Sequence, residues 1–199
     1  DAGELSEGQS KSDDVVDARG DSRSDSPVFD RRALLKARAV PKRYKIEPSM
    51  GHSMPDILLP YLFDAAEIRI RDPYLRKHHQ IRNVHEILLQ LIQHADAARL
   101  PRVVIETCAS DEDDYRAKQE TMFEQLQQSW EPFGIVIDWS IVDYFHDRSI
   151  VTDTGWVIDL GRGLDVYEAY TPISQFDPRY AIPHLRRTKE ITINVSKER

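Results

Sequence analysis

The stretch His146-Asp147-Arg148-Ser149-Ile150-Val151-Thr152-Asp153 places a histidine, an arginine and an aspartate in the spacing H-x-R-x4-D. Successive side chains of a β-strand point to opposite faces, so a strand here would direct His146 and Arg148 to one side. Asp153-Thr154-Gly155 is typical of a tight turn into a second strand, which we expect from Trp156 to Leu160. Histidine can attack phosphorus, arginine can hold phosphate oxygens, and a carboxylate can orient the imidazole. The stretch therefore predicts phosphate chemistry or phosphate binding.

Strands and helices alternate along the rest of the chain. Alternating apolar and polar residues predict strands, and apolar residues spaced three and four apart predict helices. The expected strands are 67–71, 102–107, 135–142 and 190–195, and the expected helices follow an N-cap at Ser53 and cover 78–95 and 111–130. This order favours an α/β domain, with helices on both faces of a mixed, largely parallel sheet. We expect Asp72, Ser110 and the segment 144–146 to meet at the carboxyl edge of that sheet.

The composition limits the class of protein. With 199 residues, of which 40% are hydrophobic, the chain can bury one good core. The single cysteine, Cys108, excludes an internal disulfide framework and a cysteine-built zinc site, and its place at the end of an apolar strand predicts burial. No apolar run has the length of a membrane-spanning helix and the start is unlike a signal peptide, so we expect a cytoplasmic protein. The first residue is Asp1 rather than methionine, which suggests a piece of a larger protein.

Charge divides the N-terminal part in two. Residues 1–30 hold nine acidic and three basic side chains, and the segment from Arg31 to Lys45 holds basic residues without an acid among them. We therefore predict a disordered linker over residues 1–43, acidic and then basic, followed by a folded domain over 44–199. The basic run either docks on anionic lipid or nucleic acid, or is a solvated linker that contacts nothing specific.

Two separated segments resemble one family. The segment Asp72–Asn83 is similar to the D-P-Y-[IL]-R…Q…N signature of the phospholipase D-like domain found behind microtubule-interacting-and-trafficking (MIT) domains. The segment from His146 to Gly161-Arg162-Gly163-Leu164-Asp165 is similar to the second signature of that family, and H-x-R-x4-D resembles the phospholipase D motif H-x-K-x4-D with arginine in the lysine position. The similarity spans roughly residues 49–195.

The resemblance implies a phospholipase D-like half-unit that self-associates into homodimers and, in eukaryotic members, binds membranes. It also implies an appended module with a covalently linked upstream domain, since bacterial members resemble C-terminal pieces of larger proteins, some of them AAA+/Lon-type ATPases. A position peripheral to the membrane would follow. We expect neither a cofactor nor a metal site.

Guanidinium groups match phosphate oxygens, so the arginines near these segments are candidate ligand-binding residues. The full set of candidates is Asp72, Arg76, Arg82, Asn83, His146, Arg148, Asp153, Arg162 and Asp165. The alternative for each arginine is an ion pair within the domain, for instance with Asp72 or Asp165.

Hydrolysis of the phospholipase D type needs two such motifs, one histidine for attack and one for protonation of the leaving group. This chain carries one motif, so catalysis by His146, Arg148 and Asp153 would require a dimer. In addition, the planar guanidinium of Arg148 binds phosphate with a different geometry from the lysine ammonium of the phospholipase D motif. The sequence favours a non-catalytic, dimeric accessory module that binds a phosphate-bearing ligand, either an anionic membrane surface or nucleic acid. The alternatives are a phosphodiesterase or nuclease assembled across a dimer, and a scaffold with a vestigial pocket.

Overall fold

The computed structural model describes residues 30–94, 100–109, 113–174 and 176–198. The helices and strands of this part follow one another in the order α1 (Arg31–Arg38), β1 (Lys42–Ile46), α2 (Met54–Leu62), β2 (Glu67–Arg71), α3 (His78–His94), β3 (Arg102–Cys108), α4 (Asp113–Trp130), β4 (Val136–Val142), β5 (Ser149–Thr152), β6 (Trp156–Leu160) and β7 (Ile191–Lys197). The chain is therefore an α/β domain, as predicted. Among these helices, none is long and apolar enough to cross a membrane.

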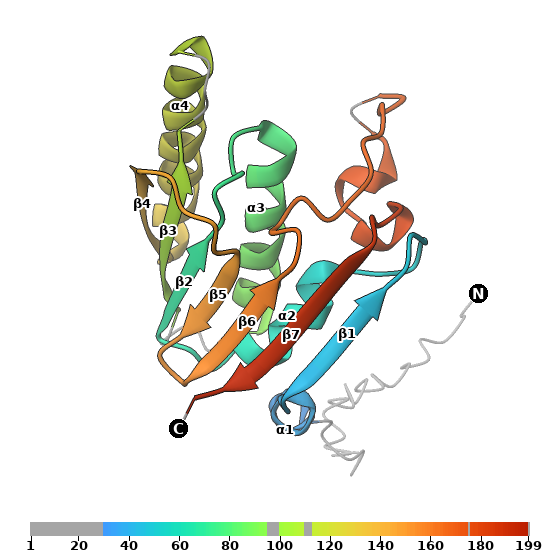
Figure 1. The fold of residues 1–199 in the computed structure, drawn as a ribbon. Coiled ribbons are helices and arrows are strands. Elements are labelled where there is room, and N and C mark those ends of the chain that lie inside the picture. Colours follow the sequence, from blue (N-terminus) through green and yellow to red (C-terminus); the bar gives the residue numbers. More distant parts are fainter. Residues whose placement is uncertain (1–29, 95–99, 110–112, 175, 199) are drawn as a thin grey trace, which may run out of the picture.

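The strands form one sheet in the order β1-β7-β6-β5-β2-β3-β4 (Figure 1). β2, β3 and β4 are parallel because a helix joins each of them to the next. The other neighbours pair antiparallel, and Gly155, with φ 86°, takes the turn of the β5–β6 hairpin that the sequence predicted. The expected mixed sheet is thus confirmed. The expectation of a largely parallel sheet was wrong, because β5, β6, β7 and β1 all pair antiparallel with their neighbours, and β1 was not predicted.

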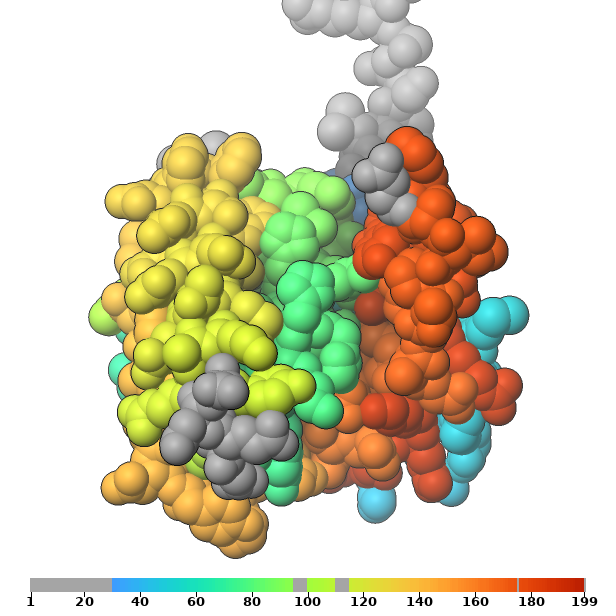
Figure 2. All heavy atoms as spheres, turned by 90° about the horizontal axis from the view of Figure 1, so that it is seen from above, coloured from blue at the N-terminus to red at the C-terminus, as the bar shows by residue number. Residues whose placement is uncertain are grey.

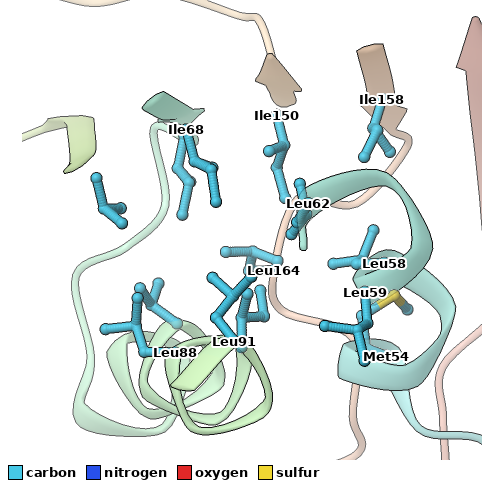
Figure 3. Close-up of a cluster of buried hydrophobic side chains, with 14 of the residues drawn as sticks. Met54, Leu58, Leu59, Leu62, Ile68, Leu88, Leu91, Ile150, Ile158 and Leu164 are labelled. Atoms are coloured by element: carbon cyan, nitrogen blue, oxygen red, sulfur yellow. The ribbon is translucent and has the colours of Figure 1, made fainter. Parts of the chain in front are cut away.

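In the part of the chain that the structure describes, helices cover one face of the sheet, so the expectation of helices on both faces was wrong. Figure 1 shows α2, α3 and α4 behind the sheet. Ile68 of β2 points toward the helices in Figure 3, and Ile70, two residues further along the strand, is buried like Ile68. The opposite face carries charged side chains, where Arg102 pairs with Asp138 at 2.6 Å and Arg71 pairs with Glu106 at 2.8 Å. Charged groups of this kind are favourably solvated, so this face offers little apolar surface for a second helical layer.

The core lies between the sheet and the helices (Figure 3). Leucines of α2 and α3 meet isoleucines of β2, β5 and β6 there; the labelled residues are Met54, Leu58, Leu59, Leu62, Ile68, Leu88, Leu91, Ile150, Ile158 and Leu164. Leu164 comes from the loop after β6 rather than from a helix or strand, and its side chain is fully buried. Cys108 is buried as predicted, and its thiol donates to the carbonyl of Asp143.

The segment 31–43 belongs to the folded domain, which corrects the expectation of a linker there. Asp30 accepts a hydrogen bond from Ala33 N and caps α1, and Leu35 is buried in the core. β1 pairs with β7. The cationic side chains of this segment mostly point to solvent, which is why its composition resembles that of a linker. Residues 1–29, the rest of the predicted linker, lie outside the described residues.

The long connection between β6 and β7, residues 161–190, is held against α3 by a buried charged cluster. Arg186 pairs with Glu86 and donates to Asn83 Oδ1 at 3.4 Å, and its guanidinium lies 3.9 Å from the ring of Tyr167. Arg82 also reaches Glu86, at 3.2 Å. The cluster fixes this connection over α3 and so positions the loop that follows β6.

Candidate functional site

The site begins with two loops at one edge of the sheet, the upper edge in Figure 1. One loop follows β2 and starts at Asp72, and the other follows β6 and runs from Gly161 to Asp165. Asp72 is 1% exposed and joins them, because its carboxylate accepts hydrogen bonds from Leu164 N at 2.6 Å and from Tyr74 N at 3.0 Å. Burial raises the pKa of Asp72 above 3.8, against these two hydrogen bonds and the charge of Arg148.

Gly163 and Asn83 complete this joint. Gly163 has φ 68°, and a Cβ atom at this position would collide with the Asp72 carboxylate, so no other residue fits without a shift of the loop. Asn83 Nδ2 donates to the Leu164 carbonyl at 2.5 Å. The backbone of Leu164 is therefore held on its N–H side by Asp72 and on its carbonyl side by Asn83.

A cavity of about 360 Å³ opens between the two loops. It is lined by Tyr74, Gln80, Arg148, Gly161, Arg162 and Asp165. Gln80 is buried, and its Oε1 accepts hydrogen bonds from Arg76 N and Lys77 N, which fixes the start of α3 at the wall of the cavity. We refer to this cavity as the arginine pocket.

Arg148 is the central cation of the arginine pocket. Its Nη1 donates to the Gly161 carbonyl at 2.9 Å, and its guanidinium carbon lies 4.7 Å from the centre of the Tyr74 ring. Its Nε is buried and has no hydrogen-bond partner among the described residues. Arg76 lies 5.6 Å from the same ring, and the exposed Arg162 stands at the rim. Three of the predicted arginines thus gather around Tyr74 and the pocket.

Asp165 supplies the one carboxylate of the pocket lining. Lys189 Nζ donates to its Oδ2 at 2.7 Å, and His79 Nε2 lies 3.5 Å from its Oδ1. Burial lowers the pKa of His79, and the negative charge of Asp165 offsets part of this effect. The negative charge of Asp165 is therefore largely matched by Lys189, so Arg148 and Arg162 leave the pocket suited to an anion.

His146 lies outside the arginine pocket. β5 begins at Ser149, so the expectation that a strand directs His146 and Arg148 to one side was wrong. The His146 ring is exposed, packs edge-on against Tyr144 at 4.6 Å, and has its Nδ1 3.3 Å from the Tyr144 hydroxyl. The chain lacks regular strand geometry here because it has just left β4 and must turn back across the sheet.

Asp153 lies at the opposite end of β5 from Arg148. Its Oδ1 accepts hydrogen bonds from Ala66 N at 2.9 Å and from Glu67 N at 3.2 Å, and so holds the start of β2. The expected role in orienting the imidazole of His146 is contradicted, because four strand residues separate the two ends. Of the three residues in the H-x-R-x4-D spacing, Arg148 lines the pocket, His146 lies outside it, and Asp153 has a structural role at the start of β2.

Arg82 has the internal partners that the sequence left open as an alternative. Its guanidinium donates to the Tyr170 hydroxyl at 3.1 Å and to the carbonyls of Arg179 and Tyr180, besides its contact with Glu86. Arg82 and Asn83 thus hold the surrounding structure rather than line the pocket. Ser110, expected at the same edge, lies outside the described residues.

Sequence reasoning missed Tyr74, Gln80 and Gly161 as lining residues. All three lie inside the two segments that carried the family resemblance, but none has a charge to mark it. Tyr74 contributes an aromatic face, Gln80 accepts hydrogen bonds from two backbone N–H groups, and Gly161 provides a carbonyl acceptor. These roles depend on the fold, so in the sequence the three residues were recognisable only as members of the family motifs.

Comparisons with known proteins give two findings. Residues 51–197 match the sequence model of the family described as "Phospholipase D-like domain at C-terminus of MIT". The MIT domain-containing protein 1 of Mus musculus is 30% identical over 156 residues, which cover 77% of this chain and 61% of the relative. The chain thus spans about three fifths of the length of this curated relative.

Proposed function

We propose a function that proceeds from one premise: the chain belongs to the family of phospholipase D-like domains found at the C-terminus of MIT proteins. The family resemblance inferred from the two sequence segments is therefore confirmed. On this premise, the chain is a non-catalytic accessory module that forms a homodimer and binds a phosphate-bearing ligand in the arginine pocket. It does so for a larger protein to which an upstream domain attaches it, in the cytoplasm and peripheral to a membrane.

One observation carries this proposal: the buried Nε of Arg148 has no partner among the described residues. Buried donors in folded proteins are nearly always hydrogen-bonded, and a guanidinium donor suits a phosphate oxygen best. Arg162 and the aromatic face of Tyr74 lie in the same lining. A phosphate in the pocket would satisfy Arg148 and take its second charge contact from Arg162. An anionic lipid headgroup and nucleic acid both offer this phosphate.

The positions of His146 and Asp153 support a module without hydrolytic activity. A general base or nucleophile must lie within hydrogen-bond reach of the reacting group, and neither residue lines the pocket that Arg148 lines. The chain also carries a single copy of the motif. Binding therefore accounts for the arrangement better than catalysis.

Arg148→Ala is expected to weaken the binding of inorganic phosphate by about 10- to 100-fold, or about 1–3 kcal/mol for a charge-assisted hydrogen bond. Isothermal titration calorimetry on the full chain measures this. The matched control is Arg69→Ala, because Arg69 is exposed on the charged face of the sheet and pairs with Glu67. Unchanged phosphate affinity in a folded Arg148→Ala variant would remove the pocket from the proposal.

A phosphodiesterase or nuclease is the second candidate, and the exposure of His146 favours it, since an exposed imidazole can meet a partner subunit. Light scattering of the full chain at micromolar concentration is expected to give a dimer mass, which both candidates need. We expect wild type and His146→Ala to show the same absence of turnover on DNA, RNA and phospholipid. Cleavage that disappears in His146→Ala would establish the enzyme instead, and a monomer mass would contradict both candidates.

A further inference from the structure

A second cavity, of about 370 Å³, opens between α3 and α4. Figure 2 shows α3 in green between α4 in yellow and the β6–β7 connection in orange, and this connection contributes Tyr180 and Ala181 to the lining. We call this space the helix cavity. Among the described residues, none lines both the helix cavity and the arginine pocket. Cavities that take small molecules usually measure about 300–1,000 Å³, so the helix cavity has the size of a small-molecule site.

The walls of the helix cavity are largely apolar. They are formed by Ile81 and Leu89 of α3, Met122 and Leu126 of α4, and Tyr180 of the β6–β7 connection. Leu89 and Tyr180 are exposed to solvent although they line a concave surface. An apolar molecule in the cavity would remove these side chains from water, which favours its binding.

Glu86 gives the helix cavity a buried hydrogen-bond acceptor. The side chain lines the cavity and is 6% exposed, and its Oε2 pairs with Arg186. Its Oε1 lies 3.2 Å from Arg82 Nε without the geometry of a hydrogen bond, and has no hydrogen-bond partner in the described part of the chain. Buried polar atoms in folded proteins are nearly always hydrogen-bonded. A donor on a bound molecule would therefore satisfy Oε1.

His85 gives the same cavity a hydrogen-bond donor. Trp130 Nε1 donates to His85 Nδ1 at 3.1 Å, so Nδ1 carries no proton. Burial lowers the pKa of His85, and the charge of Arg82 lowers it further, so the imidazole is neutral at pH 7. A neutral imidazole that accepts at Nδ1 carries its proton at Nε2. The N–H of Nε2 is thus the polar group that this residue offers to a ligand.

The charges around Glu86 favour an uncharged ligand. Arg82 and Arg186 both contact this single carboxylate. A cationic ligand would be repelled by the two guanidinium groups, and an anionic ligand would be brought against the carboxylate itself. An uncharged donor avoids both penalties and still supplies the hydrogen bond that Oε1 lacks.

We infer that the helix cavity binds an uncharged apolar molecule with an N–H or O–H donor, which donates to Glu86 Oε1. An acceptor on the same molecule would meet the N–H of His85 Nε2. The class of ligand differs from that of the arginine pocket, where the lining attracts an anion. The inference therefore goes beyond the proposed function and does not depend on it.

The first experiment uses indole as the probe and N-methylindole, which lacks the donor, as its matched control. The NMR signal of the Trp130 indole N–H in the full, nitrogen-15-labelled chain reports binding, because this group bonds to His85 at the cavity. Indole is expected to shift this signal with a dissociation constant of about 1 mM or below, as is usual for a ligand of its size. Trp156 packs against Tyr61 instead, and its signal is expected to stay in place.

N-methylindole is expected to bind at least tenfold more weakly than indole, since it leaves the buried Oε1 of Glu86 unsatisfied. Equal affinities would show an apolar surface without recognition by Glu86 and would overturn the inference. A Trp130 signal that indole does not move up to its solubility limit would overturn it as well.

Two variants of α4 locate the probe. Ser129 is exposed and lines the helix cavity, whereas its neighbour Gln128 is exposed and is not part of the lining. Ser129→Phe fills the cavity and is expected to weaken indole binding at least tenfold, and Gln128→Phe is expected to keep the affinity within twofold of wild type. Indole binding that is unchanged in Ser129→Phe would place the probe elsewhere and refute the site.

A competition experiment separates this inference from the proposed function. Saturating inorganic phosphate is expected to leave the affinity for indole within twofold of its value without phosphate, because the two sites have separate linings. Indole that phosphate displaces would belong to the arginine pocket and would overturn the helix cavity as a site. Failure of the chain to bind phosphate at all would contradict the proposed function and leave the indole result to stand by itself.

Discussion

Glu86→Ala is expected to lower the free energy of unfolding by about 3–5 kcal/mol, the usual cost of removing one partner from a buried ion pair. Glu86 is 6% exposed and Arg186 is 4% exposed, so the variant leaves the Arg186 charge buried without its carboxylate. Arg82, which also contacts Glu86, loses the same partner. Urea denaturation of the full chain, followed by circular dichroism, measures the change.

Two comparisons make this result specific to the buried cluster. Glu120→Ala removes a carboxylate that pairs with Arg116 on the surface of α4, and it is expected to cost less than about 1 kcal/mol. Glu86→Leu combined with Arg186→Met removes both charges and is expected to recover much of the loss, because apolar residues pack well in place of a buried pair. If Glu86→Ala costs no more than Glu120→Ala, the cluster does not hold the β6–β7 connection.

Asp72→Ala is expected to cost about 2–4 kcal/mol of unfolding free energy and to abolish phosphate binding. The variant leaves the N–H groups of Leu164 and Tyr74 without their acceptor, and each unsatisfied buried donor costs about 1–3 kcal/mol. Part of this cost is offset because a buried carboxylate is no longer desolvated. The loop 161–165 then loses its tie to the loop after β2, and the pocket between them loses its shape. Chemical denaturation and calorimetry with phosphate give the two readouts.

The pH dependence of stability tests the same residue. The folded state raises the pKa of Asp72 above 3.8, so it binds this proton more tightly than the unfolded chain does. The contribution of Asp72 to stability therefore falls as the pH rises from about 4 through the folded pKa. In Asp72→Asn this decline is expected to disappear, because asparagine does not titrate. A wild-type pH profile that Asp72→Asn leaves unchanged would contradict the raised pKa.

The sequence predicted the strand–helix–strand half of the fold, and in the other half it predicted the β5–β6 hairpin and β7. Periodicity located β2, β3 and β4 with α3 and α4 between them, and the parallel pairing followed from their alternation. It failed for α1 and β1, because Lys42, Arg43 and Lys45 leave few apolar residues to set a period. The sequence also did not predict that helices cover only one face of the sheet. The charged side chains of the other face form ion pairs between different strands, and a single stretch of sequence does not reveal such pairs.

The sequence predicted only part of the candidate site, because a guanidinium group can bind either a phosphate oxygen or an oxygen of the protein itself. Arg148, Arg162 and Asp165 were among the predicted ligand-binding residues, and they line one pocket at the carboxyl edge of the sheet. Arg82 was an equally plausible pocket residue, since carbonyl and phosphate oxygens accept the same hydrogen bonds from a guanidinium. Only the fold shows that Arg82 donates to oxygens of the protein itself. His146 was misplaced because the spacing H-x-R-x4-D does not say where a strand begins.

Leu164 ties the arginine pocket to the stability of the whole domain. Its side chain sits in the core while its backbone forms the joint with Asp72 and Asn83, so the loop cannot swing open without exposing buried leucine. The arginine pocket is thus formed without a ligand, and the phosphate binding that we propose for it would lose little conformational entropy to ordering. By the same linkage, a bound ligand raises the melting temperature in proportion to the logarithm of its concentration, once that exceeds the dissociation constant. Thermal melting thus becomes a binding assay for a ligand whose identity need not be known beforehand.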